Sequence, residues 1–131
     1  MESVEDQLGW LSKLSTSQWD NYLSAYLDWL NNIDCRNISK RSIQKAWDGI
    51  VNGDVDSIYE EYVRFYTHDL KILWLQEEYL VTARNVTLKD KLVQVLNAES
   101  TPFFSIGALH LGGPKGILNL LRSNGYEVVQ R

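Results

Sequence analysis

Cysteine and histidine are both scarce in this sequence. Of 131 residues, one is a cysteine, Cys35, and two are histidines, His68 and His110. A single cysteine excludes a disulfide within the chain. A catalytic divalent metal usually takes about three protein ligands and keeps one position open for water. Two histidines therefore leave few ways in which this chain alone can complete a metal site.

Positive charge and long apolar runs are lacking too. Lysine and arginine number 13 against 17 acidic residues, which gives a net charge of −4 and a pI of about 5.1. This balance disfavours a broad phosphate-binding face, so we expect no nucleic-acid partner. No apolar run approaches the ~20 residues of a membrane span. The first ten residues, MESVEDQLGW, lack the apolar segment of a signal peptide. We expect no membrane insertion by this chain and a cytoplasmic location by default, or an extracytoplasmic one if it is part of a longer precursor.

What is present is typical of a soluble globular protein. Hydrophobic residues make up 44% of the chain and charged residues 23%. A chain of this length predicts one domain with a sizeable core. All five tryptophans and six of the seven tyrosines fall within the first 80 residues. Aromatic side chains that line one face of a helix are typical of a core, and exposed ones could bind a peptide or mediate dimerisation.

The first 97 residues carry the apolar periodicity of amphipathic helices. Ser15 and Asp54 are placed to cap helices, and Asn52-Gly53 is placed to end one. The sequence predicts helices over residues 3–14, 17–31, 39–51 and 55–66, a long helix from 67 to 82 or beyond with a bend at 85–87, and a last helical stretch over 88–97.

The pattern changes after Pro102. Phe103–Ile106 is a short continuous apolar run and predicts a buried strand. A helix with Pro114 in its first turn follows, and Tyr126–Gln130 predicts a final strand. The expected fold class is therefore α+β and mostly helical. One domain, 1–131, would comprise a helical segment (1–97) and a β-α-β segment (102–131) that forms part of a parallel sheet.

His110 stands just after the first predicted strand, where α/β proteins often place ligands. A neutral imidazole there could bind Zn²⁺, Mn²⁺ or Co²⁺, or move a proton near neutral pH. The alternative is a histidine that is hydrogen-bonded to a turn carbonyl. Lys115, beside a predicted helix start, could help to hold an anion, although the loop lacks the spacing of a nucleotide-binding P-loop.

The segment FFSIGALHLGGPKGILNLLRSNGYEVVQ resembles the C-terminal signature of the TraB/GumN family, which is related to the Tiki metal-dependent proteases. Upstream, Arg84-Asn85 is similar to the family's Glu-Arg-Asn motif, and residues 2–8 are similar to its mid-chain Glu-Thr and Glu-Gln-Leu stretch. The matching positions in the C-terminal signature are Gly107-Ala108-Leu109-His110, Gly112, Gly113, Gly116, Leu121, Gly125 and Tyr126.

The resemblance implies a divalent-metal site for peptide hydrolysis, built by two Gly-x-x-His motifs. His110 matches the second motif and is the implied metal ligand. No first motif occurs in this chain, and Ala83 stands where the glutamate before Arg84-Asn85 is expected. The candidate catalytic residues are therefore Arg84, Asn85 and His110, with Mn, Co or Zn as the possible metal.

Glu77 and Lys115 are the candidate substrate-binding residues. Glu77 lies seven residues before Arg84, so on one helix the two would share a face, as an ion pair or with Glu77 as a relocated acid. Two functions remain open. One is a non-catalytic or incomplete family member that binds a peptide or protein partner. The other is a metal-dependent peptidase half-site, completed by homo-oligomerisation or by a complementary N-terminal half.

Overall fold

The computed structural model describes residues 5, 8–32, 34–98 and 101–129. Helices and helical turns dominate this part of the chain. In order they are η1 (Leu11–Lys13), α2 (Thr16–Asn31), α3 (Cys35–Asn52), α4 (Val55–Arg64), η2 (Phe65–Asp69), α5 (Leu73–Leu75), η3 (Gln76–Leu80), α6 (Thr82–Ala98), η4 (Ala108–His110) and α7 (Ile117–Ser123). The predicted helix over 3–14 lies partly outside the described residues, and its described end is the 3₁₀ turn η1.

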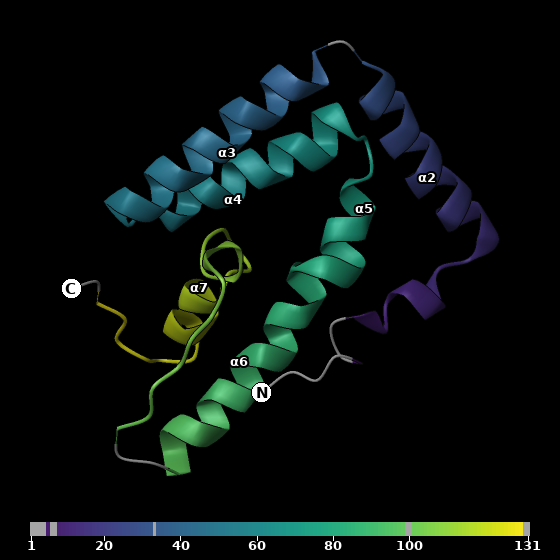
Figure 1. Cartoon of the computed structure of the whole chain (residues 1–131). Coiled ribbons are helices and arrows are strands. Elements are labelled where there is room, and N and C mark those ends of the chain that lie inside the picture. The colour runs from purple at the N-terminus through teal and green to yellow at the C-terminus, as the bar shows by residue number, and fades with distance from the viewer. Residues whose placement is uncertain (1–4, 6–7, 33, 99–100, 130–131) are drawn as a thin grey trace.

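Figure 1 shows how these elements are arranged. α2 and α3 meet at a corner, and α4 returns antiparallel along α3. α5, η3 and α6 then lead away from that corner. α7 packs against α6, and the η4 turn packs against α4. Two elements distant in sequence, α4 and α6, thus hold the C-terminal segment between them.

The helix boundaries follow from the predicted caps. Ser15 accepts a hydrogen bond from the backbone N–H of Gln18, and the Gln18 side chain accepts one from Ser15 N, which completes a capping box. Gly53 ends α3 in the left-handed conformation, with φ 69°. Asp54 then caps α4 by accepting from Ser57 N at 3.0 Å. These local predictions are confirmed.

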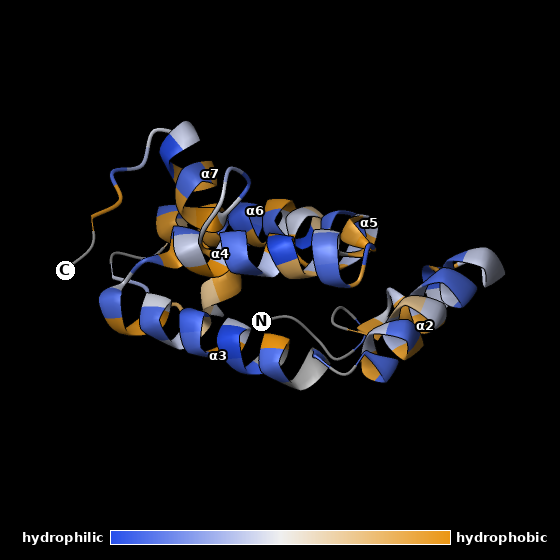
Figure 2. Cartoon of the chain, turned by 90° about the horizontal axis from the view of Figure 1, so that it is seen from above, coloured by the Kyte–Doolittle hydropathy of each residue, from blue (hydrophilic) through white to orange (hydrophobic). Residues whose placement is uncertain are grey.

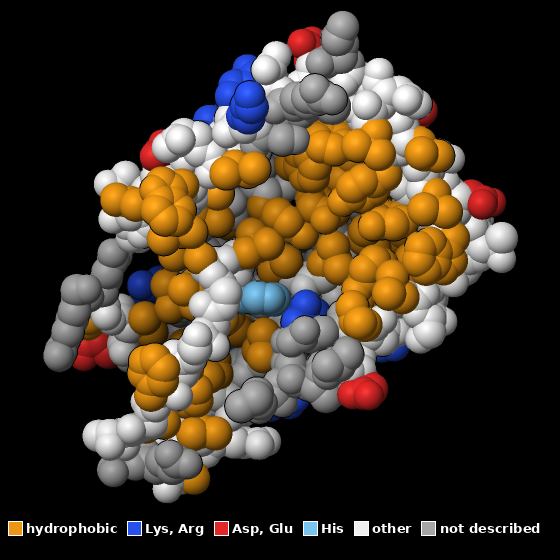
Figure 3. Space-filling view, in the orientation of Figure 1, with side chains coloured by type: hydrophobic (Ala, Val, Ile, Leu, Met, Phe, Trp, Pro, Cys, Tyr) orange, Lys and Arg blue, Asp and Glu red, His pale blue; other side chains and the backbone are white. Residues whose placement is uncertain are grey.

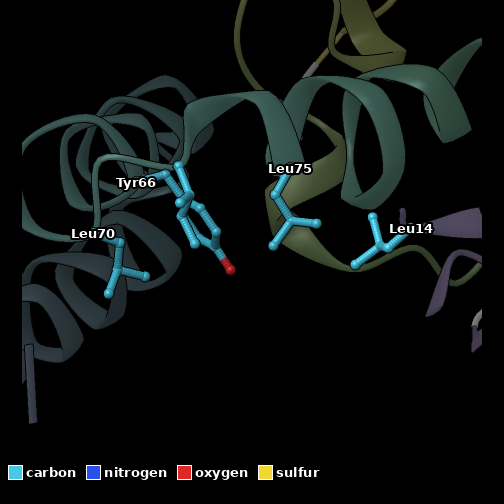
Figure 4. Packing of buried hydrophobic residues seen from close by; sticks show 5 residues of the cluster. Leu14, Tyr66, Leu70 and Leu75 are labelled. Carbon is cyan, nitrogen blue, oxygen red and sulfur yellow. The ribbon is translucent and has the colours of Figure 1, made fainter. Parts of the chain in front are cut away.

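The core lies where α2, η2 and α5 converge. Ile72 and Leu75 are completely buried, and Leu14, Tyr66 and Leu70 are nearly so; Figure 4 shows the packing. Partly buried aromatic side chains pack against these residues, and we call them the aromatic cluster. Its members are Trp10, Trp19, Tyr22, Tyr26, Trp29, Tyr62, Phe65, Trp74 and Tyr79. Several contact one another edge to face, for example Trp29 and Phe65 with ring centroids 5.6 Å apart.

The predicted β-α-β unit is wrong. Residues 103–106 and 126–129 have no regular secondary structure, and the part of the chain that is described contains no strand or sheet. Phe104 and Ile106 are half-buried, whereas Phe103 is 92% exposed. Only one face of the first segment is therefore packed against the protein. A continuous apolar run does not distinguish this arrangement from a strand buried on both faces. The last helix also begins later than predicted, at Ile117 rather than near Pro114.

The predicted long helix is broken rather than continuous. Two π-helical turns, η2 and η3, interrupt it, and Lys71 between them has a φ of 56°. The chain turns there so that Ile72 and Leu75 both point into the core. Conversely, α6 runs without interruption through 85–87, where a bend was predicted. Burial of Ile72 and Leu75 accounts for the first difference.

Glu61 forms the main electrostatic link between α3 and α4. Its buried carboxylate accepts hydrogen bonds from Ser42 Oγ at 2.7 Å, Arg64 Nη2 at 2.7 Å and Lys45 Nζ at 3.2 Å. The Arg64 hydrogen bonds, followed by those from Ser42 and Lys45, outweigh burial and lower the pKa of Glu61 from 4.5 to about 2.

We expect Glu61→Gln to lower the free energy of unfolding at pH 7 by about 2 kcal/mol. The pKa shift alone would give a larger loss, but solvent screens the interactions of Glu61 with the partly exposed side chains of Lys45 and Arg64. The pKa is lower in the folded state, so the stabilisation is complete above about pH 4.5. It is lost as the pH falls toward 2, since the unfolded chain protonates first. Urea unfolding at several pH values measures the difference between wild type and variant. The exposed neighbour Glu60, changed to Gln, is the control. A difference that stays constant from pH 7 to pH 3 would contradict the prediction.

Candidate functional site at Asn85 and His110

Asn85 and His110 are 25 residues apart in sequence and in direct contact in the fold. His110 ends the η4 turn, where its N–H donates to Gly107 O at 2.9 Å. Asn85 lies in the first turn of α6 and is 1% exposed. The His110 Nδ1 atom lies 2.6 Å from Asn85 Oδ1. Two of the predicted catalytic residues therefore form one site.

The contacts of Asn85 fix the tautomer of His110. Asn85 Nδ2 donates to the Lys115 carbonyl at 2.8 Å, which identifies the other amide atom as oxygen. Because that oxygen can only accept, His110 Nδ1 carries the proton, and Nε2 carries the lone pair in the neutral ring. Proteins position metal-binding or proton-accepting histidines in this way: a hydrogen bond to one ring nitrogen fixes the orientation of the other.

The glycine-rich loop after His110 is held closely against α4. A Cβ on Gly112 would lie under 3.0 Å from the backbone of Val55, and one on Gly113 would lie under 3.0 Å from the Tyr59 ring. Gly113 N donates to Asp56 Oδ1 at 2.8 Å, and its φ is +82°. The glycines therefore allow close packing between helix and loop, which positions His110 over Asn85.

Arg84 and Ala83 are placed differently from Asn85. Arg84 is half-buried, and its Nη1 atom donates to Leu80 O at 3.2 Å, at the junction between η3 and α6. Ala83 is exposed. Positions 83 and 85 are separated by about 200° around a helix, so a side chain at 83 is directed away from His110. The alanine therefore leaves the Asn85–His110 contact itself unaffected.

Glu77 and Lys115 stand at the margin of the site. Glu77 is exposed on η3. Burial raises the pKa of Tyr59, and the negative charge of Glu77 raises it further. The predicted Glu77–Arg84 pairing assumed one continuous helix, whereas η3 and the bend at Val81 intervene. Lys115 contributes its carbonyl to Asn85, while its side chain is exposed.

Sequence reasoning missed Asp56 and Tyr59. Both lie in the first turns of α4 and meet the glycine-rich loop 57 and 54 residues further along the chain, at Gly113. Asp56 looks like an ordinary acidic residue in the first turn of a helix. No local signal links it to the loop, because only the packing of η4 against α4 brings them together.

The comparisons with known proteins give one match. The model of the TraB/PrgY/gumN family matches residues 1–130. The chain belongs to this family. Neither the curated proteins nor the solved structures include a match to it. The predicted family membership is confirmed, whereas the relation to the Tiki proteases stays a prediction.

The resemblance described above implies a divalent metal for this TraB/PrgY/gumN protein, which stays a prediction, so the donor set must be compared with it. His110 offers an imidazole ring whose Nδ1 atom contacts Asn85. Within the described residues, however, no group of three or more His, Cys, Asp or Glu side chains gathers at one point. The described donors therefore do not fit a metal site with three protein ligands. Nor does the described part of the chain contain a helix that is long and apolar enough to cross a membrane.

Proposed function

We propose that this TraB/PrgY/gumN protein binds a peptide or a protein partner and holds no catalytic metal by itself. One observation carries the proposal. On the face seen in Figure 3, hydrophobic side chains form a broad surface, and a histidine side chain lies beside it. Apolar surfaces of this kind mark interaction sites on soluble proteins.

The chemistry of the aromatic cluster suits a peptide ligand. Trp19, Tyr22 and Tyr26 are only partly buried, and successive rings on α2 contact one another at 5.8 and 4.9 Å between centroids. Tyrosine and tryptophan offer a large apolar area together with a polar group, which is why binding surfaces are enriched in them. We therefore expect the ligand to be a peptide with apolar side chains.

Two synthetic peptides test this proposal in the presence of EDTA. One contains alternating leucine and phenylalanine, and in the other serine replaces these residues. Titration followed by tryptophan fluorescence should give a Kd of roughly micromolar order for the apolar peptide and at least about tenfold weaker binding for the serine peptide.

The matched variants are Trp19→Ala, within the aromatic cluster, and Phe103→Ala, which removes an exposed aromatic ring outside it. We expect Trp19→Ala to weaken binding of the apolar peptide roughly tenfold, about 1.4 kcal/mol, and Phe103→Ala to leave it unchanged. Equal binding of both peptides, or no binding at millimolar concentration, would overturn the proposal.

A second candidate function is favoured by the orientation of His110. The Asn85 contact leaves Nε2 as the basic nitrogen, as a metal ligand requires. The chain would then be half of a metal-dependent peptidase site, completed by a second copy or by a complementary N-terminal half. Native mass spectrometry with Mn²⁺, Co²⁺ and Zn²⁺ distinguishes the two functions. Stoichiometric metal uptake that is lost in His110→Ala, together with peptide cleavage, would favour the half-site.

A further inference from the structure

α2 and α3 each carry a second apolar stripe, apart from the face that each turns toward the protein. On α2, Leu23 and Leu27 are 50% and 59% exposed. On α3, Ile43, Trp47 and Ile50 are 70%, 61% and 53% exposed. The spacings of four and three residues align the members of each stripe along one helix face. We call them the α2 stripe and the α3 stripe.

These stripes are not the packed faces of the two helices. α2 contacts the core through members of the aromatic cluster, such as Trp19 and Trp29. α3 faces α4 through Ser42, Lys45 and Gly49. Single exposed leucines are normal on a protein surface, whereas exposed apolar side chains that align along a helix are a feature of interaction sites.

The charges beside the two stripes are complementary. α2 contains two acidic residues, Asp20 and Asp28, and no basic residue; both are exposed. Among its described side chains, α3 exposes three basic residues, Lys40, Arg41 and Lys45, and one acidic residue, Asp48; Lys45 pairs with Glu61. Asp20, Asp28, Lys40 and Arg41 take part in no ion pair within the described residues. Contact between two copies of α2 would bring like charges together, whereas α2 of one copy on α3 of another would bring opposite charges together.

The dimensions also match. α2 has 16 residues and α3 has 18, which correspond to about 24 and 27 Å of helix. Figure 2 shows α2 standing apart from α4, α6 and α7, with α3 also at the edge of the molecule. A twofold axis that places α2 on the partner's α3 necessarily places α3 on the partner's α2, so both pairs form at once.

We propose that a second copy of this chain covers the two stripes, with α2 of each copy packed against α3 of the other. The residues of the two stripes are not members of the aromatic cluster, so the proposal does not depend on peptide binding. Its apolar centre excludes water, and the flanking charges select the α2–α3 pairing over α2–α2.

Two double variants test the pairing in the full chain. Asp20→Lys/Asp28→Lys makes α2 basic, and Lys40→Glu/Arg41→Glu makes the exposed charge on α3 acidic. Sedimentation equilibrium should show a dimer for wild type and, for each variant alone, a dimer dissociation constant raised at least roughly tenfold. An equimolar mixture of the variants should restore the dimer as a heterodimer, since both helix pairs are then again of opposite charge.

Trp47→Glu, within the α3 stripe, should give a monomer, while Phe103→Glu, outside both stripes, should leave the dimer intact. Circular dichroism of each variant confirms that it is folded, and the charge variants keep the test valid if Trp47→Glu unfolds. A wild-type chain that is monomeric at about 100 μM would overturn the proposal and would leave the stripes to another partner or to a segment of a longer chain. A dimer that both charge variants leave unchanged would equally overturn it.

Discussion

Gly113→Ala is expected to lower the free energy of unfolding by about 3 kcal/mol or more. Two physical causes combine. The φ of +82° places a residue with a side chain in the left-handed region, and the new Cβ would lie under 3.0 Å from the Tyr59 ring. Either the ring or the loop must move, which separates η4 from α4. Urea unfolding measures the loss, and the His110 ring signals in NMR report whether the site has moved.

Gly125→Ala provides the matched control. Gly125 has nearly the same φ, +86°, but nothing lies within 4 Å of the position that its Cβ would take. The conformational cost alone is about 1 kcal/mol, so the difference between the two variants measures how tightly the glycine-rich loop packs on α4. Equal losses in the two variants would contradict the role that we assign to Gly113.

Asn85→Ala is expected to lower the free energy of unfolding by about 3 kcal/mol. Asn85 is fully buried and bonds two groups at once, His110 Nδ1 and the Lys115 carbonyl. Truncation removes both bonds and leaves a cavity where a polar side chain was. Asn124→Ala is the control, since Asn124 also donates to a backbone carbonyl, that of Leu120 at 2.8 Å, but is exposed. Thermal and urea unfolding should show a loss below about 1 kcal/mol for this control.

A double-mutant cycle with His110→Ala isolates the contact itself. Residues in one hydrogen-bond network are coupled, so the two single losses should exceed the loss in the double variant by about 1–2 kcal/mol. Additive losses would contradict a direct Asn85–His110 bond. The same variants should leave α3 and α4 folded, because the Glu61 network is separate from this site.

The candidate site was predicted in part. Arg84, Asn85 and His110 were identified by their resemblance to family motifs, and the fold brings Asn85 and His110 together. The sequence could not indicate that Asn85 also binds the Lys115 carbonyl or that Asp56 binds Gly113 N. These bonds join segments 30 and 57 residues apart, and neither partner carries a local pattern that anticipates the other.

The errors in the fold also have a common origin. Phe103–Ile106 has the composition of a strand, yet no second extended segment pairs with it within the described residues. The predicted helix from 67 to 82 has the right periodicity at each end, yet π-helical turns and a left-handed Lys71 divide it. In both cases the local preference was compatible with more than one structure, and burial against distant elements chose between them.

The sequence by itself determined the helix boundaries at Ser15, Gly53 and Asp54 and the family of the protein, and it nominated Asn85 and His110 as candidate site residues. Caps act through hydrogen bonds that span three or four residues, so local chemistry is sufficient for them. Only the tertiary structure decided that residues 102–129, the described part of the C-terminal segment, form no sheet and that Asn85 contacts His110. Those outcomes depend on burying Asn85 and packing the glycine-rich loop against α4, which lies far away in the chain, and no local pattern encodes this.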